Sequence, residues 1–207
     1  MAADVRPASS QDLAPGSDFR RLYEVTMQRL DAAPVYFFGD DYYRELLDSL
    51  GENLLIAEVG NQAGAVGSLL LLMRHADRLH NHLSCSNPED ACMGSNNLVF
   101  WTATQFAVEQ GLRRYHLGGG HSERDSLFKH KQSFGGHELE YGVSGLIIDP
   151  KVYESRVESR AKECDSTPDA LLACNYFPAP TEDRSPVAKT PQPFYSVRVT
   201  RAPCVLR

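Results

Sequence analysis

A run of glycines beside lysine and histidine side chains is the part of the sequence best suited to chemistry. Residues 115–136 read YHLGGGHSERDSLFKHKQSFGG, in which three consecutive glycines follow a short apolar stretch. Bare backbone N–H groups can approach an anion closely, and the start of a following helix adds a favourable dipole. Gly118, Gly119 and Gly120 are therefore candidates for binding phosphate or another anionic group. A flexible turn is the alternative explanation of the same composition.

Lys131 is the candidate for a charged group at this segment. In the helix predicted over residues 124–135, Lys131 shares a face with Leu127 and Phe128 at helical spacing. An ammonium on a half-buried face can hold a phosphate or a developing oxyanion. A solvated surface lysine is the alternative. His116 and His121 flank the glycines, where a histidine side chain can move protons near neutral pH.

A second set of hydrogen-bond donors precedes the next long helix upstream. The loop CMGSNN at residues 92–97 offers backbone amides after Gly94 together with polar side chains. We interpret it as a second place for a pyrophosphate, with ordinary helix capping as the alternative. The residues concerned are Gly94, Ser95, Asn96 and Asn97.

The spacing of histidines and cysteines does not predict a metal site. His80 and His82 share a strand face, but no Asp, Glu or Cys completes a familiar ligand set nearby. The five cysteines include no C-x-x-C pair, so we expect free thiols. No serine, cysteine or carboxylate pair forms a recognisable hydrolase arrangement.

The overall composition sets the class of protein. The chain has 207 residues, 42% of them apolar, and a net charge of −6. This acidity argues against non-specific binding to nucleic acid, which depends on basic patches. The longest apolar runs are too short to cross a bilayer, and the N-terminus shows no secretory signal. We expect a cytoplasmic protein with a packed core.

Hydrophobic periodicity predicts alternating helices and strands. Asp18 is the expected N-cap of the first helix, and Gly51 is expected to end the second. We predict helices over 19–30, 40–51, 98–111, 124–135 and 150–164, and strands over 53–60, 65–73, 78–86, 113–120 and 137–149. This order is typical of a mixed sheet with helices on both faces, of α+β or α/β class.

The strand at residues 78–86 has a strict alternation that predicts its two faces. Leu79, Asn81, Leu83 and Cys85 are expected on one face, opposite the histidines. The segment that follows, from Asn87 to Asn97, is predicted to be a loop because it is rich in turn-forming residues.

Composition also divides the chain into three parts. Residues 1–17 are small and polar, and we expect a flexible N-terminus. Residues 18–163 are predicted to form a single domain. Seven of the 12 prolines follow Cys164, so residues 164–207 are expected to be a disordered or loosely docked tail.

The glycine segment and the helix after it resemble the GNAT-fold acyltransferases of the FemAB type, also called BioF2-like acetyltransferase domains. In that family a strand ending in L-G-G-G precedes a helix carrying F-K-x-x-F/W-G, which Lys131, Phe134 and Gly135 match. His130 stands where the family usually has an aromatic residue. The resemblance covers residues 18–158. It implies a GNAT-like, mostly antiparallel twisted sheet with helices on both faces, an α+β fold.

The resemblance also implies roles for the candidate residues. The sheet would splay to admit an acyl donor, and Lys131 would contact the donor's phosphates or terminal adenosine, or steady the oxyanion. Gly118 to Gly120 would let the chain pass close to donor or acceptor, and His121 and Tyr141 are candidates for proton transfer. The usual pyrophosphate loop of GNAT enzymes is replaced by CMGSNN, and FemAB-type enzymes commonly carry two such domains.

Three functions follow as hypotheses. The first is transfer of an acyl group from acyl-CoA, a co-substrate and not a tightly bound cofactor, to a small-molecule or peptide amine. The second is peptide-bond formation that depends on aminoacyl-tRNA, so that tRNA would be a partner. The third is a non-catalytic half-domain that binds a metabolite, a second copy of the chain or a partner domain.

Overall fold

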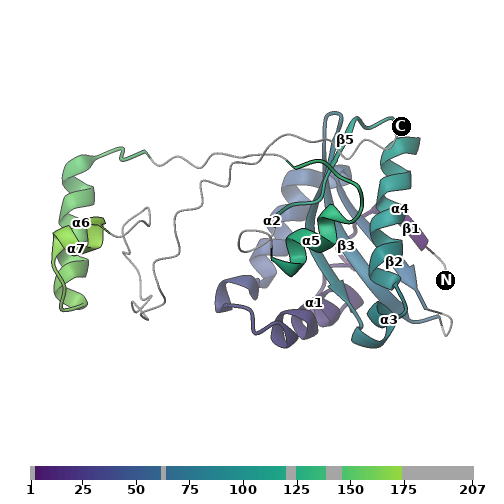
Figure 1. Cartoon of the computed structure of the whole chain (residues 1–207), viewed down its shortest axis with the longest axis horizontal. Coiled ribbons are helices and arrows are strands. Elements are labelled where there is room, and N and C mark those ends of the chain that lie inside the picture. The colour runs from purple at the N-terminus through teal and green to yellow at the C-terminus, as the bar shows by residue number, and fades with distance from the viewer. Residues whose placement is uncertain (1–2, 62–63, 120–124, 139–145, 174–207) are drawn as a thin grey trace. The chain divides into compact units, whose positions relative to one another are not determined.

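The computed structural model describes residues 3–61, 64–119, 125–138 and 146–173 (Figure 1). These residues divide into two compact units, one ending at Gly136 and one beginning at His137. The elements of the first unit are β1 (Ala3–Pro7), α1 (Asp18–Arg29), η1 (Pro34–Tyr36), α2 (Asp40–Leu50), η2 (Gly51–Asn53), β2 (Leu54–Gly60), β3 (Val66–His75), β4 (Arg78–Ser86), α3 (Pro88–Cys92), α4 (Ser95–Glu109), β5 (Arg114–His116) and α5 (Ser126–Gln132).

A five-stranded sheet in the order β1-β2-β3-β4-β5 forms the centre of the first unit. The first four strands pair antiparallel, and β5 pairs parallel to β4. β2 and β3 are covered on both faces, which explains why their sequences are nearly continuous apolar runs and do not alternate with polar residues. The predicted hairpin at these two strands is confirmed.

The N-terminal residues correct one prediction. Residues 3–7 lie within the segment that we expected to be flexible, yet they form β1 and pair with β2 from Ala3 opposite Val59 to Pro7 opposite Leu55. The strand is short and mostly exposed, so its sequence carries no apolar pattern that would mark it.

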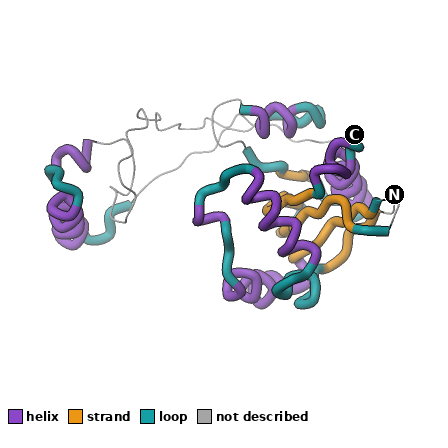
Figure 2. The backbone as a smooth tube through the Cα atoms, turned by 90° about the horizontal axis from the view of Figure 1, so that it is seen from below, coloured by secondary structure: helices purple, strands orange, loops and turns teal. Residues whose placement is uncertain are grey.

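Helices cover both faces of the sheet and create two hydrophobic cores (Figures 1 and 2). On one face α4 packs against β2, β3 and β4, with Val99, Phe100, Ala103 and Ala107 facing the strands. On the other face α1 and α2 bury aromatic side chains, including Phe19, Tyr23 and Tyr43. Burying a large apolar side chain contributes about 1.5–3 kcal/mol, so the two cores hold the sheet between its helices. The predicted fold class is confirmed.

The helix ends agree with the sequence at some points and differ at others. Gly51, at a φ of +50°, ends α2 as predicted. The N-cap of α1 is Ser17 and not Asp18, because the Ser17 hydroxyl accepts from the Arg20 N–H. α3 occupies part of the predicted loop before α4, and Pro88 at its first position favours this short helix.

A bulge in β4 overturns the predicted alternation. Leu71 of β3 faces Leu83, but the next residue, Leu72, faces Asn81, so His82 is an extra residue in β4. Such a bulge shifts the faces of the residues that follow it. Leu79 therefore joins the α4 core, whereas Leu83 and Cys85 pack on the α1 and α2 side.

The second unit contains α6 (Pro150–Glu163) and α7 (Pro168–Ala173), with Asp149 as the N-cap of α6. The sequence predicts residues 137–163 in the same domain as the sheet, but the compact unit that holds the sheet ends at Gly136. Of the strand predicted over 137–149, residues 139–145 lie outside the described residues, and 146–149 are not a strand. No helix among the described residues is long and apolar enough to cross a membrane.

Candidate active site

The edge between β4 and β5 opens after a short stretch of pairing. The two strands are in register from Arg78 opposite Arg114 to His80 opposite His116, where β5 ends. β4 continues to Ser86, and no strand of the described chain pairs with this second half on the β5 side. Backbone N–H and C=O groups along such an edge are available to form hydrogen bonds with another molecule. The bulge at His82 changes the direction of some of these groups.

Two histidines meet at the last pair before this opening. The Nδ1 atoms of His80 and His116 lie 2.8 Å apart, and the rings stack with centroids 4.9 Å apart. Burial, with added effects of nearby positive groups, lowers the pKa of His80 to about 4, and burial also lowers the pKa of His116. Both imidazoles are therefore neutral at pH 7, one Nδ1 donating to the other. A neutral imidazole can accept a proton.

A third histidine, also on β4, contacts helix α2. The Nε2 atom of His82, the bulge residue, shares a hydrogen bond with the Tyr42 hydroxyl of α2. Tyr42 in turn stacks on Phe38 with ring centroids 4.0 Å apart. Burial lowers the pKa of His82 and raises the pKa of Tyr42, so both are uncharged at pH 7. Helix α2 thus supports the bulge at a distance of 40 residues in sequence.

The structure brings Lys131 and two of the predicted glycines together. The Lys131 ammonium donates to the carbonyl oxygen of Gly119 at 2.7 Å. A Cβ atom on Gly118, which has a φ of +78°, would lie 3.1 Å from the Lys131 Nζ. The glycine segment therefore presents a carbonyl to the lysine, and a side chain at Gly118 would displace it.

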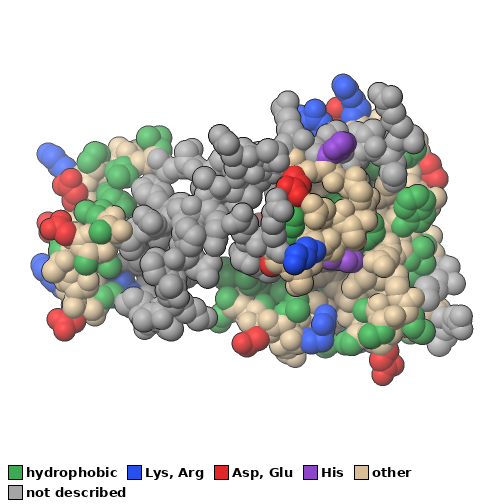
Figure 3. All heavy atoms as spheres, viewed as in Figure 1, with side chains coloured by type: hydrophobic (Ala, Val, Ile, Leu, Met, Phe, Trp, Pro, Cys, Tyr) green, Lys and Arg blue, Asp and Glu red, His purple; other side chains and the backbone are tan. Residues whose placement is uncertain are grey.

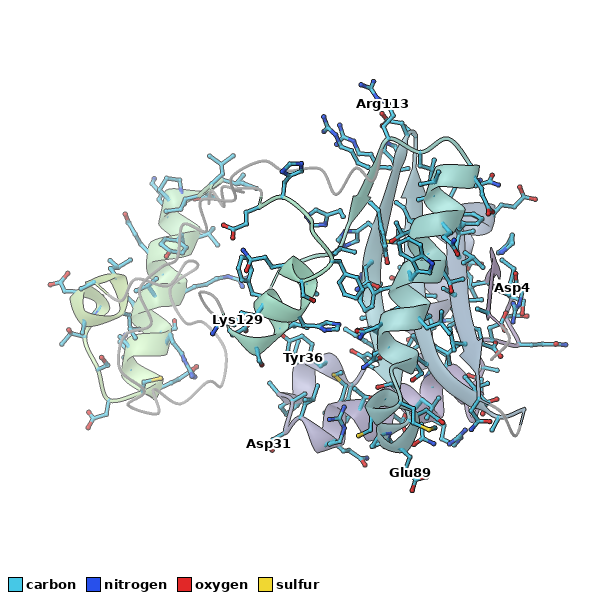
Figure 4. All side chains as sticks on the ribbon, turned by 45° about the vertical axis from the view of Figure 1, so that its right-hand side comes forward. Asp4, Asp31, Tyr36, Glu89, Arg113 and Lys129 are labelled. Carbon is cyan, nitrogen blue, oxygen red and sulfur yellow. The ribbon has the colours of Figure 1, made fainter. Side chains whose placement is uncertain are left out.

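Lys131 is also electrostatically coupled to the histidines. Its positive charge contributes to the lowered pKa values of His80 and His116, and burial lowers its own pKa against the opposing effect of Asp125. Lys129, two residues earlier on α5, is exposed and points away from the sheet (Figure 4). Histidine and basic side chains reach the surface close to one another in the space-filling view (Figure 3).

Helix α5 owes its position to its cap and to aromatic contacts. The Asp125 carboxylate accepts from the Phe128 N–H at 2.7 Å, so Asp125 is the N-cap of α5. Phe134, just after α5, packs on Phe100 of α4 with centroids 5.3 Å apart, and His130 meets Phe100 edge-on. These contacts tie α5 to the α4 core and so place Lys131.

The second predicted site, at residues 94–97, has its side chains engaged elsewhere. The Ser95 hydroxyl is buried and lies 2.7 Å from the Ser68 hydroxyl of β3, which also donates to the Asn96 Oδ1 at 3.4 Å. Gly94 begins α4 at a φ of +89°, and no side chain caps the helix. The Asn97 side chain is exposed. Ser95 and Asn96 therefore attach α4 to the sheet, whereas Asn97 is left on the surface.

Several predicted residues cannot be placed with this cluster. Gly120, His121 and Tyr141 lie outside the described residues. Among the described residues no group of three or more His, Cys, Asp or Glu side chains is arranged to hold a metal ion. The role of Tyr42 and the pairing of His80 with His116 were missed, because strand pairing between distant segments leaves no local signal in the sequence.

Comparison with known proteins adds a family and a fold. The family described as Acetyltransferase (GNAT) domain matches residues 7–131. An aminoglycoside acetyltransferase from an uncultured soil metagenomic sample superimposes with a TM-score of 0.51 and 12% identity, over 72% of this chain and 100% of that one. A possible acetyltransferase from Clostridium difficile 630 gives a TM-score of 0.53 and 11% identity, over 72% and 99%. At these identities the likeness concerns the fold alone. No curated protein matches the chain.

Proposed function

The chain belongs to the acetyltransferase (GNAT) domain family, and on that premise we propose that it transfers an acyl group from acyl-CoA to an amine where β4 and β5 part. The observation that carries the proposal is the neutral pair of His80 and His116 at the last paired position. It combines a proton acceptor with an open strand edge, and the proposed acylation would use both.

In the proposed reaction the donor lies along the open edge of β4 with its thioester near the histidines. The amine nitrogen attacks the carbonyl carbon, the C–S bond breaks, and the coenzyme leaves as a thiolate. Holding the two reactants together supplies much of the acceleration. The backbone N–H groups exposed near the bulge and the Lys131 ammonium are suited to stabilise the oxyanion, because preorganised donors are effective in a partly dehydrated site.

The histidine pair would take the proton that the amine loses. An ammonium ion has no lone pair for attack, so the acceptor must be deprotonated before or during the reaction. Because burial keeps His80 and His116 neutral at pH 7, they are ready to accept that proton. His82, held by Tyr42, would keep the bulge in place beneath the thioester.

The alternative donor is an aminoacyl-tRNA, which the FemAB-type motif around Lys131 predicts. The net charge of −6 disfavours it, because tRNA binding depends on basic surface. We therefore favour acyl-CoA as the donor, and the experiment includes aminoacyl-tRNA as a competing ligand.

The test combines ligand-induced stabilisation with turnover. We expect acetyl-CoA to raise the Tm of the full chain, and purified protein to release free thiol when amines are added. Lys131→Ala should lower kcat by roughly a hundredfold, as loss of an oxyanion donor does. Lys129→Ala, on the exposed side of the same helix, is the matched control and should leave kcat unchanged.

Two results would contradict the proposal. One is the absence of any Tm shift or thiol release with a panel of acyl-CoAs. The other is competition by charged tRNA, but not by CoA, at low salt. If Lys131→Ala and Lys129→Ala changed kcat equally, Lys131 would have no role in the mechanism. The proposal that acyl-CoA is the donor would not be affected by that result.

A further inference from the structure

Lys131 is a half-buried amine that has no acidic partner. Its ammonium donates to the Gly119 carbonyl, and none of the ion pairs formed within the described part of the chain involves it. A lysine that leaves water is usually paired with a carboxylate, because burial disfavours the ammonium form. Burial accordingly lowers the pKa of Lys131. An amine whose charged form is disfavoured in this way is a nucleophile, and this chemistry is separate from that of an oxyanion donor.

The amine of Lys131 lies where an acyl group would be transferred. A Cβ atom on Gly118 would lie 3.1 Å from the Lys131 Nζ and 4.0 Å from the backbone oxygen of Asn81, so the amine is close to β4. The charge of Lys131 also lowers the pKa values of His80 and His116, the last residues that pair between β4 and β5. A nucleophile and a proton acceptor of the same chain therefore lie near one another.

We propose that Lys131 is a self-acylation site, whose Nζ takes the acyl group from bound acyl-CoA when no acceptor amine is present. This inference rests on the proposed function. The ammonium first passes one proton to the histidine pair, and the neutral amine attacks the carbonyl carbon of the thioester. The C–S bond breaks, an amide forms at Nζ, and a second proton of the nitrogen goes to the leaving thiolate.

The position that suits Lys131 as an oxyanion donor also suits it as a nucleophile. A donor lies about 3 Å from the oxyanion, and a nucleophile attacks the carbonyl carbon from about 3–3.5 Å. The two atoms of a carbonyl are about 1.2 Å apart, so one flexible side chain reaches both. Acylation removes the charge of the lysine. Self-acylation would thus lower the activity of the protein when acceptor amine is scarce.

Lys129 is an internal control on the same helix. It lies two residues before Lys131, but it is exposed and points away from the sheet (Figure 4). Exposed lysines react slowly with thioesters without catalysis, and Lys129 reports this background rate. A reaction directed by the site should depend on His116 and on competing acceptor amine, whereas the background reaction should depend on neither.

The experiment incubates the full chain with acetyl-CoA and follows the acetylation of each lysine by peptide mass spectrometry. In the wild type we expect Lys131 to react about tenfold faster than Lys129 or more, because its reactants are held together. The rate per chain should not depend on protein concentration, since the reaction occurs within one chain. This comparison needs no variant to fold.

Two further measurements connect the reaction to the site. His116→Asn should slow the acetylation of Lys131 by about a hundredfold, because the proton acceptor is lost. An added amine that the protein acetylates should also slow it, by competing for the acyl group. Neither change should alter the rate at Lys129.

The outcomes separate this inference from the proposed function. If an added amine is acetylated while Lys131 reacts no faster than Lys129, the inference is wrong and the proposed function stands. A rate at Lys131 that rises with protein concentration would place the reaction between chains and would also overturn the inference. If acetyl-CoA neither raises the Tm nor acylates any amine, the proposed function fails and the inference fails with it.

Discussion

Two segments of the sequence combine glycine, a helix start and polar side chains, and the structure treats them differently. At Gly94–Asn97 the polar side chains of Ser95 and Asn96 bond to Ser68 and attach α4 to the sheet. At Gly118 and Gly119 the neighbouring Lys131 contacts a glycine carbonyl beside a pair of neutral histidines. A similar composition therefore attaches a helix to the sheet in one place, and in the other it lies beside a lysine and two histidines.

The largest expected effect comes from removing the proton acceptor. His116→Asn should lower kcat by about 10²- to 10⁴-fold, because asparagine cannot take the proton from the amine. Asn96→Ala, in the segment that we assign to the fold, should change kcat by less than about threefold, because surface and structural polar groups add nothing to the chemical step. Steady-state rates at saturating donor and acceptor measure both. Similar losses of kcat in His116→Asn and Asn96→Ala would contradict the assignment of one segment to the fold and the other to the reaction.

Two glycine substitutions compare the segments, because alanine at either position should cause similar backbone strain. Gly118 and Gly94 both have positive φ, so alanine at either should destabilise by about 1–2 kcal/mol. Only at Gly118 would the new Cβ press on Lys131, at 3.1 Å, whereas nothing lies within 4 Å at Gly94. We expect similar losses of Tm but a loss of activity for Gly118→Ala alone. Full activity of Gly118→Ala would mean that the position of Lys131 is unimportant.

A smaller effect is expected at the start of α4. Ser95→Ala removes one of the two partners of the buried Ser68 hydroxyl and should lower the free energy of unfolding by about 0.5–1.5 kcal/mol. The KM for acyl-CoA should stay at the wild-type value, since the Ser95 side chain faces the core. Urea unfolding and steady-state kinetics give the two numbers. A raised KM at unchanged stability would restore Ser95 as a donor-binding residue.

The smallest expected effect is a pH dependence of stability. The pKa of His80 is about 4 in the folded chain, below its ordinary value of 6.5. Between these values the unfolded chain binds more protons, so stability should fall as the pH drops from 6.5 towards 4 and be constant above. His80→Gln should flatten this dependence of Tm, whereas Ser95→Ala should keep the wild-type slope. An identical slope in His80→Gln would show that the pKa of His80 is not lowered in the folded chain.

Much of the fold follows from local patterns in the sequence. The apolar runs of β2 and β3, the helix end at Gly51 and the cap at Asp125 are set by residues within a few positions of one another. The glycine segment and the half-buried face of Lys131 are also readable locally, because a helical repeat and a glycine run are short-range features. These patterns suffice for the fold class and for one half of the candidate site.

The tertiary structure alone decides the rest. His80 and His116 are 36 residues apart and meet only because β5 pairs parallel with β4. One extra residue, His82, reverses the faces of the strand after Asn81, which strict alternation cannot foresee. The pairing of distant strands and a one-residue bulge depend on packing across the whole sheet, and for that reason the meeting of His80 with His116 could not be predicted from the sequence.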